Sequence, residues 1–148
     1  MSLKATLTTA MKEAMKARDA VRLGTVRMTL SAIKNKEIEA GSELDDATVT
    51  SIISTLVKQR REAAEAFRNG DRLELAAKEE AELIILQSFL PAQLSEEQVR
   101  ELVDAVVAEL GATSMKDMGG VMKVLTEKTL GQADGKLVST LVKARLCS

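Results

Sequence analysis

Apolar side chains recur every three or four residues along most of the chain, the spacing that places them on one face of an α-helix. Two such stripes end the sequence: Met115, Met118, Met122 and Leu125, then Val138, Leu141, Val142 and Leu146. Ser114 and Asp117 have capping-box spacing at the start of the first, and Gly131 is placed to end it. Asp134 can cap the second. The short connection between them predicts two helices that pack on each other.

Five earlier helices are predicted by the same spacing, over about residues 2–18, 19–40, 45–69, 71–90 and 95–110. Their expected caps are Ser2, Asp19, Asp45 or Asp46, the Asn69-Gly70-Asp71 break, and Ser95 with Gln98. Gly41 and Gly111 are placed to end the second and fifth helices. The residues expected to face inward include Leu3, Leu7, Met11, Met15, Leu23, Val26, Leu30, Ile33, Val49, Ile52, Ile53, Leu56, Ala63, Phe67, Val99, Leu102, Val103, Val106 and Leu110.

The composition strengthens the helical interpretation. The sequence contains one proline and two aromatic residues, and no alternating pattern long enough for a strand. We therefore predict an all-α fold. Pro91 disfavours helix at the residue before it, so the segment 90–94 marks a boundary. We expect a helical N-terminal subdomain of about four helices over residues 1–91 and a small three-helix subdomain over residues 92–148.

Several kinds of chemistry are disfavoured by the residue types. Histidine is absent, which removes the commonest general base and zinc ligand, and Cys147 is the single cysteine. The sequence has no glycine-rich phosphate loop of the Walker or dinucleotide type. The pair Glu79-Glu80 is interpreted as part of a solvated helix face. We expect no catalytic residue, no metal site and no cofactor, and interpret the chain as a binding or adaptor protein.

Charge is unevenly distributed, although the net charge is −1. Residues 1–36 carry a net charge of +6 and residues 113–148 a net charge of +3, while the middle is acidic. Arg27, Ser31 and Lys34 share one side of the second predicted helix, where they form either a phosphate-binding ridge or a polar seam over a helix junction. Lys58 to Arg61 favours a plain solvated face, with Glu62 and Glu65 as surface partners.

The turn from Gly131 to Lys136 leads into a helix N-terminus. Free N–H groups at such an end attract phosphate oxygens, and Lys136 adds positive charge. Asp134 opposes this interpretation because its carboxylate can accept from the same donors. A simple junction between two helices is the alternative.

The whole chain resembles the YqeY-like family. The resemblance rests on residues 27–39 (RMTLSAIKNKEIE), 58–62 (KQRRE), 77–79 (AKE) and 89–94 (FLPAQL), and on the tail motifs KDMG, VM, ADGK and LVK between residues 116 and 143. A similar tail ends the B subunit of aspartyl/glutamyl-tRNA amidotransferase, where it holds tRNA. Gly119-Gly120 stands where Gly-Lys is commoner in the pattern, which removes one cation. The resemblance implies an all-α protein with a larger N-terminal and a smaller C-terminal helical subdomain.

The function expected from these observations is that of a tRNA-binding accessory protein. The candidate nucleic-acid-binding residues are Arg27, Ser31, Lys34, Lys116, Lys123, Lys136 and Lys143. With no Trp or Tyr to stack on bases, recognition would use phosphates and overall shape.

Two alternatives remain. The first is a protein–protein adaptor that docks on translation-related proteins. Its docking surface would include Val121 and Val124 as exposed apolar residues of the tail. The second is a small ligase. The family resemblance implies a carbon–nitrogen ligase activity that uses glutamine as the amide donor, but this chain alone is not expected to catalyse that reaction. Without an apolar stretch of membrane length or a secretory segment, we expect a soluble, cytoplasmic protein with no membrane partner. The oligomeric state does not follow from the sequence.

Overall fold

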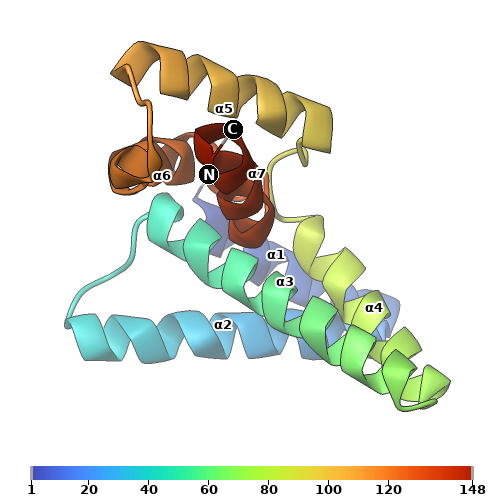
Figure 1. The fold of residues 1–148 in the computed structure, drawn as a ribbon. Coiled ribbons are helices and arrows are strands. Elements are labelled where there is room, and N and C mark those ends of the chain that lie inside the picture. Colours follow the sequence, from blue (N-terminus) through green and yellow to red (C-terminus); the bar gives the residue numbers. More distant parts are fainter. Residues whose placement is uncertain (1, 148) are drawn as a thin grey trace. The chain divides into compact units, whose positions relative to one another are not determined.

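The all-α fold is confirmed by the computed structural model, which describes residues 2–147 (Figure 1). It contains seven α-helices and one short 3-10 turn, and no strand occurs in the described part of the chain. The elements are α1 (Leu3–Ala17), α2 (Ala20–Ala40), α3 (Asp46–Asn69), α4 (Leu73–Gln87), α5 (Glu96–Leu110), η1 (Met115–Asp117), α6 (Met118–Lys128) and α7 (Gly135–Cys147).

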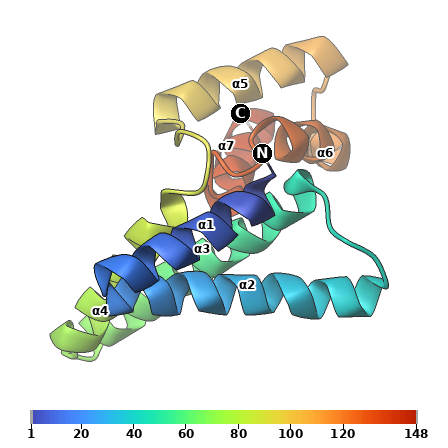
Figure 2. The same cartoon turned by 180° about the vertical axis from the view of Figure 1, so that it is seen from behind.

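The helices gather into two compact units, residues 1–91 and 92–148. In the first unit, α3 and α4 form an antiparallel pair and α1 packs on α2 (Figures 1 and 2). Its core joins buried residues from all four helices: Leu7, Ala10, Val26, Ile33, Val49, Ile53, Val57 and Leu86. That residues 1–91 and 92–148 are separate subdomains stays a prediction.

The second unit packs α5, α6 and α7 around its own core. This core consists of Val99, Val103, Val106, Val107, Val121, Leu125, Val138, Leu141, Val142 and Leu146. The chain that precedes α5 is held to the α6–α7 turn, because Leu94 N–H donates to Gln132 O at 2.8 Å and Gln93 Nε2 donates to Gly131 O at 2.7 Å. Gly131 is buried and has φ 74°, a conformation that favours glycine.

The predicted helix caps are mostly confirmed. Ser2, Asp19 and Asp45 accept hydrogen bonds from backbone N–H groups three residues ahead, and Ser95 forms a reciprocal capping box with Gln98. Asp71 is an exception. It adopts φ 60°, and Arg72 takes the N-cap position of α4 without a side-chain cap. The backbone explains this, since Arg72 N–H donates to Phe67 O at 2.8 Å and closes the end of α3.

Some expected core positions are wrong. Met15 is 50% exposed and Leu110 48% exposed, and Leu23 is only half-buried. Leu30 is also half-buried, but it packs against the core of the first unit as expected. Thr25 and Thr29 are buried in α2 instead, and their hydroxyls donate to the carbonyls of Val21 and Thr25 at 2.8 Å. Because each hydroxyl is satisfied within its own helix, the residue presents its methyl group to the core. A pattern that counts threonine as polar misses such positions.

The sixth helix also differs from its prediction at both ends. The capping box of Ser114 and Asp117 is present, but it opens the 3-10 turn η1, and α6 follows at Met118. Met115 is 42% exposed rather than part of the core stripe. The helix stops at Lys128, so Gly131 lies in the turn beyond the helix end. The stripe predicted for α7 is confirmed, because all four of its residues are buried.

Replacing Ser95 with alanine is expected to lower the free energy of unfolding by about 1 kcal/mol, because the first turn of α5 loses its side-chain acceptor. The Ser95 hydroxyl accepts from Gln98 N–H at 3.1 Å. Urea unfolding followed by circular dichroism measures the difference. Ser42→Ala, at an exposed residue in the α2–α3 connection, is the control and is expected to change nothing. Equal urea midpoints for both variants would contradict the prediction.

Candidate functional site

The α2 ridge, Arg27, Ser31 and Lys34, lies on one exposed side of the helix. Residues three and four apart on a helix are neighbours, so the three side chains form a continuous stripe. Gly24 extends it by one turn, and a Cβ placed there would meet no atom within 4 Å. Because all three side chains are exposed, they do not fill a junction between helices. That they bind phosphates stays a proposal.

Another side of α2 is fixed in place by Glu37. Its carboxylate accepts from Lys4 Nζ at 2.8 and 3.0 Å, and from Leu44 N–H at 3.1 Å. The Lys4 side chain and the Leu44 amide therefore hold the pKa of Glu37 below its ordinary value. The same contact raises the pKa of Lys4. Glu37 thereby ties α1 and the α2–α3 connection to the helix that carries the ridge.

The stability of the first unit is expected to depend on the ionisation of Glu37. A lowered folded-state pKa stabilises the fold above the unfolded value of 4.5, and this contribution disappears as the pH falls through the folded-state pKa. Glu37→Gln should therefore lower the urea midpoint at pH 7, and the difference from the unsubstituted protein should shrink as the pH falls below 4.5. The raised pKa of Lys4 stabilises the fold below the unfolded value of 10.5, and this contribution to stability is lost as the pH rises through the folded-state pKa. A difference that persists unchanged to pH 3 would contradict this account.

The second unit presents four lysines to solvent: Lys116 on η1, Lys123 on α6, and Lys136 and Lys143 on α7. None of them lies within ion-pair distance of a carboxylate among residues 2–147. Three other cations of this unit are paired: Arg100 with Glu96 at 3.1 Å, Lys128 with Glu109 at 3.9 Å and Arg145 with Asp104 at 3.1 Å. Lys136 and Lys143 are seven residues apart, so they share one side of α7 at about 10 Å along its axis.

The N-terminus of α7 already has a carboxylate acceptor. Asp134 Oδ1 accepts the backbone N–H of Lys136 at 3.2 Å. Phosphate at this helix end would face that negative charge, so the interpretation of the turn as an anion site is not favoured by the geometry. The side chain of Lys136 remains exposed and available.

The expectation of a plain solvated face at Lys58 to Arg61 is wrong for Arg60. Its side chain is 18% exposed, and its Nε lies 2.9 Å from Glu82 Oε2 and 3.4 Å from Glu79 Oε2 on α4. The Nε–H is not aligned for a hydrogen bond with either oxygen, while an Nη donates to Met28 Sδ on α2. Arg60 therefore joins three helices. Glu79 and Glu80 are likewise not simply solvated, since Glu80 pairs with Arg68.

The adaptor interpretation named two residues that the structure places elsewhere. Val121 is fully buried, and Val124 is half-buried and packs against the core of the second unit. Val121 and Leu125 are the buried residues of α6, and Met118 and Met122 of the predicted stripe are half-buried and pack against the same core. These valines therefore do not form an exposed apolar surface.

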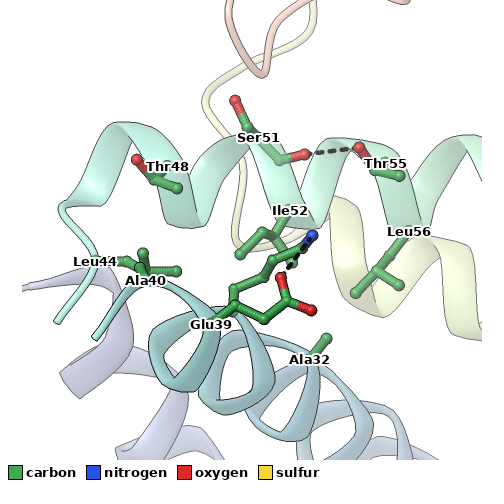
Figure 3. A pocket seen from close by; sticks show the side chains of 10 residues that line it. Ala32, Glu39, Ala40, Leu44, Thr48, Ser51, Ile52, Thr55 and Leu56 are labelled. Carbon is green, nitrogen blue, oxygen red and sulfur yellow. Dashed lines mark hydrogen bonds and ion pairs between the residues drawn. The ribbon is translucent and has the colours of Figure 1, made fainter. Parts of the chain in front are cut away.

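A groove between α2 and α3 was not predicted from the sequence (Figure 3). It has a volume of about 710 Å³ and is lined by Ala32, Lys36, Glu39, Ala40, Leu44, Thr48, Ser51, Ile52, Thr55 and Leu56. The signal for it is the spacing of Ala32, Lys36 and Ala40, which puts two small residues on one side of α2 beside the apolar side chains of α3.

Residues 2–147 form neither a metal-binding cluster nor a membrane-spanning helix. No cluster of three or more carboxylate, thiol or imidazole side chains there could hold a metal ion. No helix in that range has the length and apolarity needed to cross a membrane.

Comparison with known proteins assigns the chain to one family. The sequence model of the family described as Yqey-like protein matches residues 4–146. Relatives named "Altered inheritance of mitochondria protein 41, mitochondrial" are 34% identical over 115 residues in Vanderwaltozyma polyspora, 38% over 104 residues in Lachancea thermotolerans and 31% over 137 residues in Saccharomyces cerevisiae. These matches cover 73%, 68% and 88% of this chain, and 62%, 55% and 69% of the respective relatives. The chain thus spans little more than half the length of the first two.

These relatives correct the predicted location. Their names place them in mitochondria, which contradicts the prediction of a cytoplasmic protein. The sequence-based prediction rested on the lack of a recognisable targeting segment, and this is a weaker signal than similarity along most of the chain. The names state no substrate, RNA or enzymatic activity.

Proposed function

Since this chain belongs to the YqeY-like family, we propose that it is a tRNA-binding accessory protein related to the tail of the tRNA-dependent amidotransferase. The lysine set, Lys116, Lys123, Lys136 and Lys143, contacts the phosphate backbone. The α2 ridge supplies further contacts through Arg27, Ser31 and Lys34.

The observation that carries the proposal is the pairing of the cations in the second unit. Lys128 and Arg145 are engaged by carboxylates, whereas the lysine set is exposed with no acidic partner among the described residues. An unpaired surface lysine keeps its full charge for an external anion, and each phosphate that it neutralises releases counterions. The lysine set is therefore the part of this unit best suited to a polyanion.

The kind of nucleic acid follows from the residues that are missing. The sequence has no Trp or Tyr, and both phenylalanines, Phe67 and Phe89, are half-buried. Bases splayed from a single strand are normally held by exposed aromatic rings. A folded RNA presents its phosphates in a fixed arrangement, so lysines on helices can recognise it without stacking.

The proposal assigns no catalytic step to this chain. The only cysteine, Cys147, is exposed near the chain end, and no histidine exists to activate it. Glu37, the carboxylate with the best-defined contacts, is engaged by Lys4 and a backbone amide. An accessory role in binding agrees with this residue set better than amide transfer does.

A salt titration of tRNA binding tests the proposal. The full-length protein is titrated into a mitochondrial tRNA pool and, separately, into a homopolymer RNA of similar length, with retention on filters as the readout. The four contacts of the lysine set alone predict a slope of about −3 in the plot of log affinity against log salt, and contacts from the α2 ridge would make it steeper. We expect the tRNA pool to bind more tightly than the homopolymer. Equal affinities, or no binding at low salt, would overturn the proposal.

Introducing the cation that the family pattern has at Gly120 is expected to strengthen RNA binding. Gly120 is exposed in the first turn of α6, and a Cβ there would meet no atom within 4 Å. Gly120→Lys places a cation three residues before Lys123, so affinity should rise a few-fold and the salt slope should steepen by about 1.

Gly120→Ala is the matched control, since it adds the helix propensity without the charge. Both variants are expected to raise the free energy of unfolding by about 1 kcal/mol, because glycine is unfavourable within a helix. Only the lysine variant should bind tRNA more tightly. An equal gain in affinity for both would show that helix stability, rather than charge, limits binding.

A further inference from the structure

We propose that the α2–α3 groove binds an amphipathic helix of a partner protein, one that carries an apolar stripe and basic residues at one end. This interaction is independent of the proposed RNA binding, because the groove contains neither the lysine set nor the α2 ridge. The groove residues belong to the first unit alone.

The floor of the groove is apolar and continuous with the core. Leu44, Ile52 and Leu56 are half-buried and pack against the buried cluster of the first unit. Figure 3 shows these side chains between the two helices, with Ala32 and Ala40 on the α2 wall. Alanines at these positions leave open a space that larger side chains would fill.

The hydroxyl groups of the α3 wall are mostly engaged within the helix. Thr55 Oγ1 donates to Ser51 O at 3.0 Å, and Thr48 Oγ1 donates to Asp45 Oδ1 at 2.6 Å. Each threonine therefore has little need of a polar partner from outside and can offer its methyl group. The wall favours apolar contact more than its residue types indicate.

The length and openness of the groove fit a helix. Ala32, Lys36 and Ala40 are spaced by four residues on α2, and Thr48, Ile52 and Leu56 have the same spacing on α3. Each wall thus runs for about 12 Å, a little over two helical turns. Small residues on the walls allow a third helix axis to approach closely and to place side chains at i, i+3, i+4 and i+7 on the apolar floor.

The charge at one end of the groove predicts that the partner is positively charged there. Glu39 lines the groove and Asp45 is bonded to the lining residue Thr48, and both lie where the chain passes from α2 to α3. The hydroxyl and amide of Thr48 lower the pKa of Asp45, so this carboxylate is ionised at neutral pH. Lys36 is the only cation in the lining, and it pairs with Glu39 at 3.4 Å with both side chains more than half exposed. Glu39 and Asp45 together exceed Lys36 by one negative charge, so a basic residue of a partner would meet a net negative charge at this end of the groove.

Amide chemical-shift mapping of the isotope-labelled full-length protein tests this inference. The probe is a synthetic helical peptide of about 14 residues with leucines at i, i+3, i+4 and i+7 and lysines at one end. The control peptide carries glutamates in place of the lysines. We expect the lysine peptide to perturb the amides of Ala32, Ser51 and Thr55, and to bind more tightly than the glutamate peptide. Equal binding of the two peptides would overturn the charge assignment.

Variants of the groove separate this site from other apolar surfaces. Ser51→Phe fills the groove from an exposed position and should weaken the lysine peptide about tenfold or more, a difference of about 1.4 kcal/mol. Ala81→Phe is the matched control, because Ala81 is exposed on α4 beside Ile84, which is 66% exposed. Perturbations that cluster on α4, or equal effects of the two variants, would overturn the proposal.

Two further measurements address other occupants. In the first, dodecanoate is titrated into the labelled protein. If dodecanoate shifts the amide signals of the groove and the lysine peptide does not, the proposed ligand class is wrong. Sedimentation of the protein alone, with and without Ser51→Phe, detects self-association. A dimer that dissociates in the variant would identify a second copy as the occupant and also overturn the proposal.

Discussion

Reversing the charge of Lys116, Lys123, Lys136 and Lys143 together, each to glutamate, is expected to lower tRNA affinity by about two orders of magnitude at moderate salt. All four side chains are exposed, and no carboxylate among the described residues neutralises them. Each substitution removes one phosphate contact and adds a repulsive charge, so the remaining binding should also lose most of its salt dependence. Filter retention across a salt series measures both quantities.

The matched control reverses four other exposed lysines, Lys12, Lys16, Lys58 and Lys78, all in the first unit. It changes the net charge of the protein by the same amount, so any general repulsion of RNA is the same in both variants. We expect its loss of affinity to be far smaller. If both variants lose affinity equally, net charge rather than the lysine set controls binding.

Replacing Arg60 with methionine is expected to lower the free energy of unfolding of the first unit by about 2–4 kcal/mol, because two carboxylates lose their common cation in a poorly solvated place. Glu79 and Glu82 are each 19% exposed, and Arg60 lies within ion-pair distance of both. Without the guanidinium, two negative charges three residues apart on α4 face each other. Urea unfolding followed by circular dichroism is the measurement.

Adding Glu79→Gln and Glu82→Leu to the methionine variant should recover much of the lost stability, since replacing a complete buried ion cluster with apolar or neutral groups costs little. Lys58→Met, at an exposed neighbour on the same helix, should change stability by less than about 0.5 kcal/mol. A loss of stability for Arg60→Met no larger than that for Lys58→Met would show that the cluster contributes nothing.

Local rules were sufficient for most of the helices and most of their caps. The capping box at Ser95, the cap at Asp45 and the stripe of α7 depend on residues within one or two turns, and all three are confirmed. The inner face of α2 depended on more distant contacts. Thr25 and Thr29 are buried there because other helices cover them, and no spacing rule applied to α2 alone includes that information.

Some features of the candidate sites likewise follow from the local sequence, whereas others depend on contacts between helices. Arg27, Lys34 and the lysine set are exposed because they lie outside the apolar stripes, so the sequence was sufficient to predict their exposure. Their role in binding stays a proposal. The pairing of Arg60 with Glu82 joins residues 22 positions apart, and the α2–α3 groove depends on the divergence of two helices. Such features require the relative placement of helices within a unit, which amphipathic patterns do not specify.

The most direct test of the central claim is amide chemical-shift mapping of the full-length protein with tRNA at low salt. We predict perturbations around Lys116, Lys123, Lys136 and Lys143, with weaker ones along the α2 ridge, and all of them should disappear at high salt. The groove residues Ser51 and Thr55 should remain unperturbed. Perturbations confined to other residues, or no change at any tRNA concentration, would contradict the proposed function.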